Sequence, residues 1–357
     1  MDRNKLHLFV KATRSVYGPV DESSEQDAAE WTPPDKPGAG GYRGRYLWTD
    51  AFGVVNFITL FKETGSHKFL SLAKRLVQTV HDVLGRTRDG SSRLTGATED
   101  HPLNGGLRIG KDSATGPDGD GQYHHYLTLW MFALNRLSLA AGDPAYNELA
   151  IELAQAIHPH FLLRRPSGCL RMVWKISMDM EDVLVPSEGH LDAATGYVVY
   201  RLLQHTAQIQ SGGQATVLKR EIDEYSEIMH REGKLTPSGD TLDLGMGLWM
   251  CHFFKGEGWA DGLGEKALQM GHRLLGEDSS LMRRDASRRL AFREFGACLG
   301  IQCFGPDEYL RRRIEAVVGF WEKHLRDHTD EDLRPISQVM YAAAVIPGAW
   351  SSGYLGE

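Results

Sequence analysis

Carboxylate residues recur near the predicted starts of the apolar helical segments. They are Asp50, Asp118, Asp120, Asp192, Asp243 and Glu294. Two carboxyl groups facing one substrate can hydrolyse a glycosidic bond, because one protonates the leaving oxygen while the other activates water or acts as a nucleophile. Helix capping is the alternative role for each, since an acidic side chain in a first helical turn contributes about 0.3–1 kcal/mol of stability.

Asp120 is the first candidate for a general acid or base, and Asp50 and Asp192 are its expected partners. Neighbouring carboxylates repel and raise one another's pKa, so gathering them for capping alone would be costly. His190 offers a second chemistry. An imidazole with a pKa near about 6.5 can take up and return a proton at neutral pH, as the base of an epimerase or isomerase must.

Aromatic and polar side chains close to these acids predict the substrate contacts. The expected substrate-binding residues are Trp48, Arg108, Lys111, Tyr123, His124, Trp174, Glu188 and Glu294. Aromatic faces suit sugar rings, and the two cations could bind a carboxylate or phosphate on the substrate. Glu294 has a structural alternative, because it follows Arg293 among apolar residues, where the two could form a buried ion pair.

The segments that position these residues are predicted to be helical and of two kinds. One kind is apolar on most faces and must be surrounded by protein; it comprises 47–62, 122–141, 190–207, 241–255, 288–303 and 337–346. The other carries one apolar stripe opposite charged residues; it comprises 66–84, 145–158, 215–230, 262–275 and 307–325, with 2–15 as a possible twelfth helix. This alternation predicts an all-α fold, an (α/α)6 toroid of helical hairpins, with an open helical solenoid as the alternative.

The connections between these helices support the hairpin prediction. Residues 63–73 and 140–150 repeat one turn, in which an apolar helix stops at a glycine and an aromatic-then-Leu-Ala pattern opens the next helix. Two long insertions, 85–121 and 162–189, each precede an apolar helix, so we expect them at one end of a single-domain ring, walling its funnel. The second contains a predicted β-ribbon. The polar segment 18–41 is predicted to be a long loop or mobile arm.

Composition limits the classes of partner. The 357 residues carry a formal charge of −7, which offers no general basic field for nucleic acid or anionic lipid. The four cysteines form no CxxC pair, and no stretch of about 18 apolar residues occurs. Asp118 begins a calcium-like loop that lacks its later ligands. We therefore expect a soluble, cytoplasmic protein with no metal, no cofactor and no nucleic-acid or membrane partner.

A family resemblance appears in three places: the repeated hairpin turn, the Trp-Thr-Asp-Ala-Phe run at 48–52, and the Asp-Gly-Gln-Tyr-His-His run at 120–125. Together they resemble the six-hairpin glycosidase superfamily over most of 42–350. The resemblance implies an (α/α)6 toroid with its active site in the central funnel. Within that superfamily, 48–52 is similar to an inner-helix motif of unsaturated glucuronyl hydrolases, with Ala51 in place of glycine, and 186–193 is partially similar to a Pro-Gly-His segment of sugar 2-epimerases.

These observations favour a glycoside hydrolase-like enzyme that acts on a small carbohydrate or an oligosaccharide through carboxylate general acid and base catalysis. Two alternatives stay open: a sugar epimerase or isomerase with His190 as its base, and a binding or scaffold toroid without catalysis. A pair of carboxylates about 5–5.5 Å apart would suit a retaining hydrolase and a pair about 6.5–9.5 Å apart an inverting one. A lone acid beside a histidine would favour the epimerase, and a plugged funnel the scaffold. The sequence does not determine the sugar, the linkage or the oligomeric state.

Overall fold

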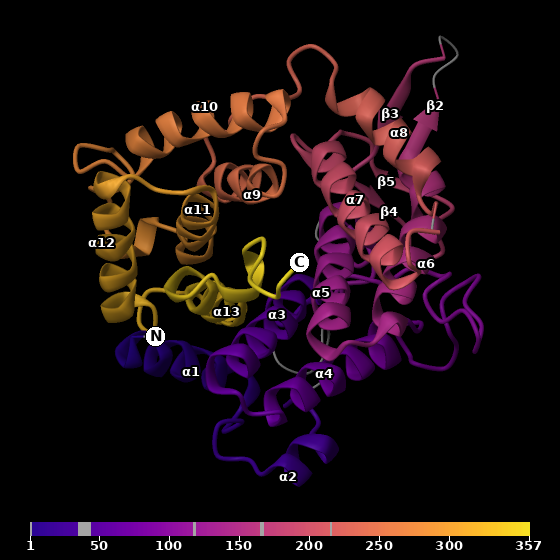
Figure 1. Cartoon of the computed structure of the whole chain (residues 1–357), viewed down its shortest axis with the longest axis horizontal. Helices are drawn as coiled ribbons and strands as arrows, with labels where there is room; N and C mark the ends of the chain where they lie inside the picture. Colours follow the sequence, from indigo (N-terminus) through magenta and orange to yellow (C-terminus); the bar gives the residue numbers. More distant parts are fainter. Residues whose placement is uncertain (1, 35–43, 117–118, 165–167, 215) are drawn as a thin grey trace. The chain divides into compact units, whose positions relative to one another are not determined.

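The computed structural model describes residues 2–34, 44–116, 119–164, 168–214 and 216–357. The chain folds into two compact units (Figure 1). Unit 1 contains residues 1–21 and 232–357, and unit 2 contains residues 22–231. The expectation of one domain over the whole chain stays a prediction. Within the described ranges, no helix is both long enough and apolar enough to span a bilayer.

Unit 2 contains three helical hairpins. They are α3 (Leu47–Thr64) with α4 (Lys68–Leu84), α5 (His124–Ala141) with α6 (Pro144–Phe161), and α7 (Asp192–Gln210) with α8 (Lys219–Met229). The members of each pair lie side by side in Figure 1. Gly65 and Gly142 end α3 and α5 with left-handed φ angles of 70° and 63°. Glycine adopts this conformation without steric cost, so the predicted repeated turn is confirmed.

The two predicted kinds of helix are present in unit 2. Helix α3 is buried continuously over residues 47–60 and contacts α5, which in turn contacts α7. Helix α4 instead buries one stripe, which includes Leu72, Leu76 and Val80. A helix that is apolar all round must have protein on every side, whereas a single stripe is buried against one neighbour. Helices α3, α5 and α7 are therefore the inner members of their hairpins.

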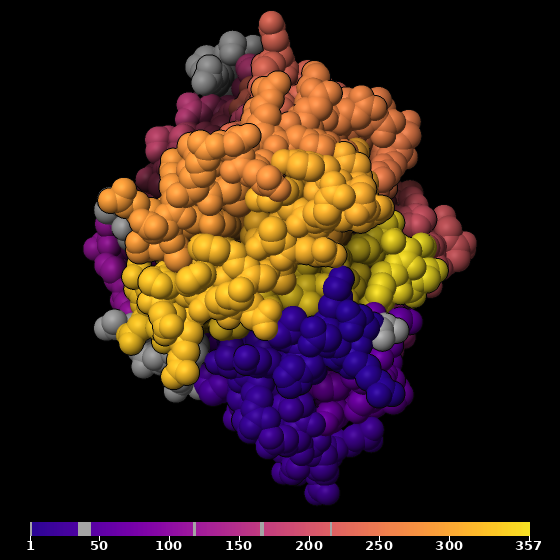
Figure 2. Space-filling view, turned by 90° about the vertical axis from the view of Figure 1, so that its left-hand side faces the viewer, coloured from indigo at the N-terminus to yellow at the C-terminus, as the bar shows by residue number. Residues whose placement is uncertain are grey.

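Unit 1 is built from the same kind of pair. Its helices are α9 (Thr241–His252) with α10 (Gly258–Leu274), α11 (Ala291–Phe304) with α12 (Glu308–His324), and α13 (Arg334–Val345) with α1 (Arg3–Tyr17). Short 3₁₀ helices occur at Ala286–Arg288, Glu331–Leu333 and Gly348–Trp350. The segment containing α12 forms part of the exposed face in Figure 2. Helices α9 and α11 meet at glycines: a Cβ added to Gly300 would lie 1.8 Å from the carbonyl oxygen of Gly245.

Short strands connect the second insertion to the residues just before α5. The antiparallel sheet β1–β4–β5 consists of Gln122–Tyr123, Lys175–Ile176 and Val183–Val185, and a second pair consists of β2 (Leu162–Arg164) and β3 (Leu170–Met172). Tyr123 is paired with Lys175 across β1 and β4. The predicted ribbon at 169–176 contains two strands, but they lie in different sheets: β3 pairs with β2, and β4 pairs with β1 and β5. The first insertion contacts this sheet through Gly119, whose carbonyl oxygen accepts from Lys175 Nζ at 2.6 Å.

The segment predicted to be a loop or arm contains a helix. Helix α2 (Glu25–Glu30) begins with a capping box between Ser24 and Asp27 and packs against α4. Its flanks are tied to α4 as well, since Arg75 Nε donates to the carbonyl oxygen of Trp31 at 2.9 Å. A capping box satisfies two orphan helical donors, which allows a short polar helix to form. Residues 35–41 of the predicted arm lie outside the described residues.

Candidate functional site

An aromatic cluster brings together three parts of unit 2: the start of α3, the β1–α5 junction, and the segment between β3 and β4. Its members are Tyr46, Trp48, Tyr123, His125, Tyr126 and Trp174. Trp48 is buried and the other five are half-buried. We call this group the aromatic cluster. It contains three of the predicted substrate-binding residues, Trp48, Tyr123 and Trp174, which the structure therefore places together.

Three rings of the aromatic cluster are stacked. The Tyr123 and Trp174 ring centroids lie 5.3 Å apart with 16° between planes, and Tyr123 and His125 lie 5.3 Å apart at 23°. The Trp48 ring lies against this stack, with its centroid 5.6 Å from that of His125, and it also contacts Tyr126, which is outside the stack, at 5.4 Å. Offset and edge-to-face aromatic pairs of this kind hold one another in fixed orientation. The cluster is a preformed, half-exposed aromatic surface.

His125 is held in one protonation state within the aromatic cluster. The Trp174 indole Nε1 donates a hydrogen bond of 2.9 Å to His125 Nδ1. Burial lowers the pKa of His125 to about 3, so the ring is neutral at physiological pH. A neutral imidazole that accepts at Nδ1 carries its proton on Nε2. His125 therefore offers an Nε2–H donor rather than a basic nitrogen.

The predicted residue His124 faces away from the aromatic cluster, although it precedes His125 directly. Its Nε2 is 2.7 Å from the hydroxyl of Tyr225, and its ring packs on Phe161. Complete burial lowers the pKa of His124 well below its usual value. Successive residues in a helix point about 100° apart, so the two histidines enter different surroundings. His124 belongs to the packing between α5, α6 and α8.

Two lysine side chains lie over rings of the aromatic cluster. Lys111 Nζ is 4.5 Å from the centroid of the Tyr46 ring, and Lys175 Nζ is 5.0 Å from that of Tyr123. Lys175 is buried and also donates to the carbonyl oxygen of Gly119 at 2.6 Å. Lys111 is half-buried. An ammonium group over an aromatic face contributes about 0.5–1 kcal/mol at exposed sites. Lys111, a predicted substrate contact, therefore lies at the edge of the cluster.

Asp120, the first candidate for acid or base, is bound on both carboxylate oxygens. Its Oδ2 accepts from Arg88 at 3.1 Å and from Arg108 at 3.0 Å, and its Oδ1 accepts from the backbone amides of Gly110, Lys111 and Gly121 at 2.9, 3.3 and 3.1 Å. Both Asp120 and Arg108 are buried. Both carboxylate oxygens are thus occupied by donors from within the protein. This network connects the two ends of the first insertion. It also binds the guanidinium group of Arg108, which was the predicted anion contact.

Asp50 lies in a separate ion pair. Its Oδ1 is 3.3 Å from Nε of Arg45, and both side chains are fully buried. Trp48 is only two residues earlier in α3 but lies in the aromatic cluster, because positions i and i+2 of a helix do not share a face. The described contacts thus place Asp50 and Asp120 in two different networks.

The other predicted residues of unit 2 lie at the start of α7. His190 is exposed, and Asp192 is 9% exposed in the first helical turn. A Cβ on Gly189 would lie 2.1 Å from Asp192 Oδ2, so the chain approaches that carboxylate closely. Glu188 Oε1 accepts from the backbone amide of Met172 at 3.1 Å, and the Arg231 guanidinium is 3.9 Å away. Glu188 therefore anchors β3 to the segment that leads into α7.

Glu294 lies in unit 1 and is ion-paired to Arg289. Its Oε1 accepts from Arg289 Nε at 2.8 Å, and its Oε2 accepts from the Trp321 indole at 2.8 Å. The sequence suggested Arg293 as the ionic partner, but Arg293 pairs with Asp240. The Glu294 side chain is 1% exposed and that of Arg289 is 3% exposed. Glu294 is thus in a buried ion pair, which is the structural role that the sequence offered as the alternative to substrate binding.

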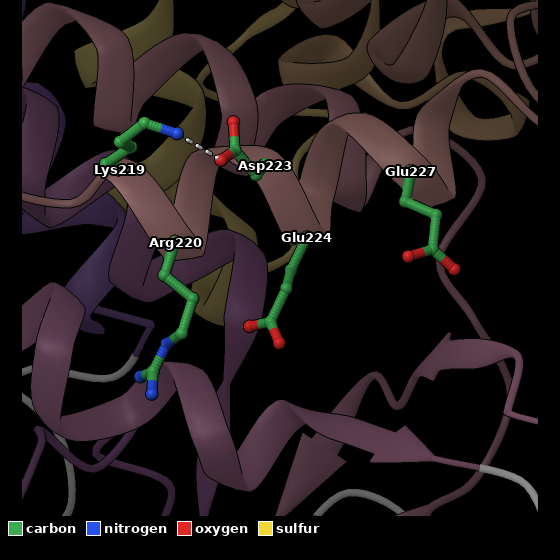
Figure 3. Close-up of a pocket in the computed structure, with 5 residues that line it drawn as sticks. All are labelled: Lys219, Arg220, Asp223, Glu224 and Glu227. Carbon is green, nitrogen blue, oxygen red and sulfur yellow. Dashed lines mark hydrogen bonds and ion pairs between the residues drawn. The ribbon is translucent and has the colours of Figure 1, made fainter.

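A pocket of about 410 Å³ on α8 is lined by Lys219, Arg220, Asp223, Glu224 and Glu227. Figure 3 shows the side chains of Arg220, Glu224 and Glu227 projecting from one side of this helix. Lys219 pairs with Asp223 at 2.9 Å, and Glu224 binds His158 Nε2 at 2.9 Å. The pocket is therefore part of the charged outer face of α8. Among the described residues, no group of histidine, cysteine and acidic side chains is arranged to hold a metal ion.

Solved structures share the fold of this chain. A family 76 glycoside hydrolase from a bovine Bacteroides thetaiotaomicron strain is 12% identical, over 96% of this chain and 77% of that one, with a TM-score of 0.59. A sugar epimerase from a ruminal bacterium is 12% identical over 94% and 98%, with a TM-score of 0.57. Cellobiose 2-epimerase from Spirochaeta thermophila is 11% identical over 96% and 97%, with a TM-score of 0.55. No family model and no curated protein sequence matches the chain.

These solved structures are (α/α)6 toroid enzymes of one superfamily. The chain has the fold of the six-hairpin glycosidases. The predicted all-α (α/α)6 fold class is confirmed, and the open solenoid is set aside. At 12% identity or less the likeness establishes the fold alone, because one six-hairpin scaffold can carry different chemistries. The reaction must be argued from this chain's own residues.

We expect acid to destabilise unit 2. Burial lowers the pKa of His81 from 6.5 to about 4 and that of His125 to about 3. Below pH 6.5 the unfolded chain therefore binds more protons than the folded chain, and the free energy of unfolding decreases as pH falls toward 4. Urea unfolding between pH 7 and pH 4 measures this slope. His81→Gln, which can still accept from Trp130, should flatten it, whereas the exposed His205→Gln should not; equal slopes would contradict the assignment.

Proposed function

We propose that the chain is a carbohydrate-active enzyme that binds a sugar ring against the aromatic cluster. The stack of Tyr123, His125 and Trp174 carries this proposal, because it presents preformed aromatic faces beside hydrogen-bond donors. Small-molecule sites combine such apolar walls with a few placed polar groups. The solved structures that share the fold include a glycoside hydrolase and sugar epimerases, which supports a sugar as the ligand.

We propose hydrolysis as the first candidate reaction, with Asp192 and His190 as the groups that transfer protons. Asp50 and Asp120 are buried and paired to arginines, so they are assigned to structure. Asp192 lies at the start of an inner helix, where the sequence predicted the site. Epimerisation is the second candidate, favoured by the exposed imidazole of His190 at the same place.

The two reactions give different products. Incubation in D₂O with α-mannosides, cellobiose and mannose, followed by NMR, distinguishes new reducing ends from deuterium exchange at C2. We expect Asp192→Asn to lower the rate by about 10²–10⁴-fold, the usual contribution of a general acid or base. His190→Asn should do the same if the base is histidine. Sugar binding without either product would favour a binding protein.

The four free cysteines are compatible with the proposed cytoplasmic location.

We expect Trp174→Ala to weaken sugar binding by about 10-fold to 100-fold, because a central aromatic contact commonly contributes at least 2 kcal/mol. Trp174→Phe should keep the stack but lose the hydrogen bond to His125, so its affinity should be intermediate. Isothermal titration calorimetry measures both. Trp259→Ala on the outer helix α10 is the control and should bind as the wild type does. Wild-type affinity in Trp174→Ala would remove the aromatic cluster as the sugar site.

A further inference from the structure

Another pocket of unit 2 lies at the end of α7, where Gln210 contributes to its lining. It has a volume of about 630 Å³, and α6 forms one of its walls through Glu148, Ile151 and Glu152. We call this cavity the α6 pocket. Helix α7 has 19 residues and is therefore about 28 Å long, so the α6 pocket is remote from Asp192 at the start of that helix.

The charged residues of the α6 pocket are acidic. Glu148 and Glu152 are one helical turn apart, which places both on the same face of α6 with Cβ atoms about 5–6 Å from each other. Two like charges at this spacing destabilise a helix. No lysine or arginine is among the described residues that line the pocket. The wall therefore carries two negative charges that no lysine or arginine of the lining offsets.

Glu152 is the more enclosed of the two acids, with its side chain 16% exposed. Its Oε1 accepts from the backbone amide of Leu103 at 2.6 Å. Its Oε2 is 3.2 Å from Nδ1 of His101, whose side chain is 62% exposed. A carboxylate can accept about four hydrogen bonds in all, so these two contacts leave acceptor capacity at the wall of the pocket. Glu152 is thus held in position while it can still bind a donor.

Charged residues beside the α6 pocket do not reverse its sign. Lys219 and Arg220, at the start of α8, each pair with an acidic residue of the same helix at 2.9 Å. Glu99 and Asp100 are exposed acids directly before His101, a lining residue. The surroundings of the pocket therefore add negative rather than uncompensated positive charge.

Apolar residues complete the lining and limit the kind of cation that fits. Pro144, Ile151, Ala207 and Val217 line the pocket beside the acids. Inorganic cations need several oxygen ligands around one point, and no group of histidine, cysteine and acidic side chains in the described ranges is arranged to hold a metal ion. Small-molecule sites of about 300–1,000 Å³ combine apolar walls with a few polar groups. The α6 pocket therefore suits an organic cation with an apolar stem.

Amide side chains supply further acceptors for such a ligand. Gln210 Nε2 donates to Ser138 Oγ at 2.9 Å, which fixes the amide and leaves its Oε1 as the acceptor at the pocket. The side chains of Asn104 and Gln155 also line the pocket and form no hydrogen bond within the described ranges. Neutral carbonyl oxygens next to carboxylates complement a ligand that donates several N–H groups.

We propose that the α6 pocket binds a primary amine with a short aliphatic stem, whose ammonium group is bound by Glu148 and Glu152. An ammonium group carries one positive charge and three N–H donors, which match two carboxylates beside amide oxygens. The stem lies against Ile151 and Val217, and the bound charge offsets the repulsion between the two acids. This inference does not depend on the proposed function, because it concerns a different site.

The experiment compares n-pentylamine with 1-pentanol, and 1,5-diaminopentane with 1,5-pentanediol, so that the members of each pair differ chiefly in charge. Calorimetry at low salt and pH 8.5 measures their binding to the full chain for the wild type, Glu148→Gln, Glu152→Gln and Glu265→Gln. Glu152→Gln keeps a carbonyl oxygen that can accept from the amide of Leu103. Glu265 is exposed on α10, so its substitution removes one negative charge elsewhere. Magnesium chloride is titrated as the inorganic cation.

We expect at least one amine to bind the wild type about tenfold more tightly than its alcohol, the usual size of a hydrogen bond to a charged group. Glu148→Gln and Glu152→Gln should each weaken amine binding by about fivefold and leave alcohol binding unchanged, whereas Glu265→Gln should bind as the wild type does.

Equal binding of each amine and its alcohol, or an amine preference that survives both pocket substitutions, would overturn the proposal. Magnesium ions that bind as tightly as the amine, and compete with it, would overturn it too, because the pocket would then attract any cation. If Glu152→Gln did not fold, Glu148→Gln alone would decide the question, since Glu148 is exposed and its loss leaves no buried group unpaired.

Discussion

Asp120→Asn should destabilise the protein by about 3–5 kcal/mol, the cost of removing one partner from a buried ion pair. The Asp120 side chain is fully buried, that of Arg108 is 5% exposed, and Arg88 shares the same oxygen. Asparagine removes the charge that both guanidinium groups face. It also replaces one oxygen with an NH₂ group, which must point at N–H donors whichever way the amide is turned. Urea unfolding measures the loss.

Two further variants make the Asp120 result decisive. Asp112→Asn removes an exposed acid eight residues away in sequence and should change stability by less than about 0.5 kcal/mol. Combining Asp120→Asn with Arg108→Gln should cost less than the sum of the single changes, because the unpaired charge is removed as well. An Asp120→Asn protein of normal stability but greatly reduced turnover would instead return Asp120 to the catalytic residues.

Glu294→Gln should have a comparable effect in unit 1, again about 3–5 kcal/mol. The amide cannot balance Arg289, whose guanidinium carbon also lies 4.1 Å from the centroid of the Phe320 ring. Replacing both partners at once, as Arg289→Met with Glu294→Leu, should recover most of the loss, since apolar residues of similar volume can substitute for a buried pair. Thermal and urea unfolding of the three proteins give the comparison.

The exposed Glu315 on α12 supplies the matched control for Glu294. Glu315→Gln should leave the unfolding midpoint within about 0.5 kcal/mol of the wild type. If Glu294→Gln folded with normal stability and lost sugar binding, the structural role would be wrong and the predicted substrate contact would stand.

Helix type could be predicted from the sequence because burial leaves a periodic pattern. The stripe of Leu72, Leu76 and Val80 identified α4 as an outer helix, and its observed end at Leu84 matches the prediction. Helix α2 was missed, since its six residues, four of them polar, are too few to show a helical period. Its capping box, Ser24 with Asp27, was the signal that could have revealed it.

The pairing of charged residues could not be predicted from sequence distance. Asp120 binds Arg88, which is 32 residues away, and Glu294 binds Arg289 rather than the adjacent Arg293. Adjacent helical residues point in different directions, and a turn outside the helix can bring an earlier residue back over it. The choice of His124 over His125 failed to identify the cluster histidine for the same reason. Which of the two rings faces the aromatic cluster depends on how α5 is rotated about its axis, and tertiary packing decides that rotation.

The glycine contact between α9 and α11 limits how this chain can change. Even alanine at Gly245 or Gly300 would place a carbon about 2 Å from backbone of the facing helix, so neither position can vary unless the helices separate. A library randomised at these positions should return glycine almost alone. Variation in what the protein recognises must therefore be sought elsewhere, in side chains such as Lys111 that lie on loops and can be exchanged without moving a helix.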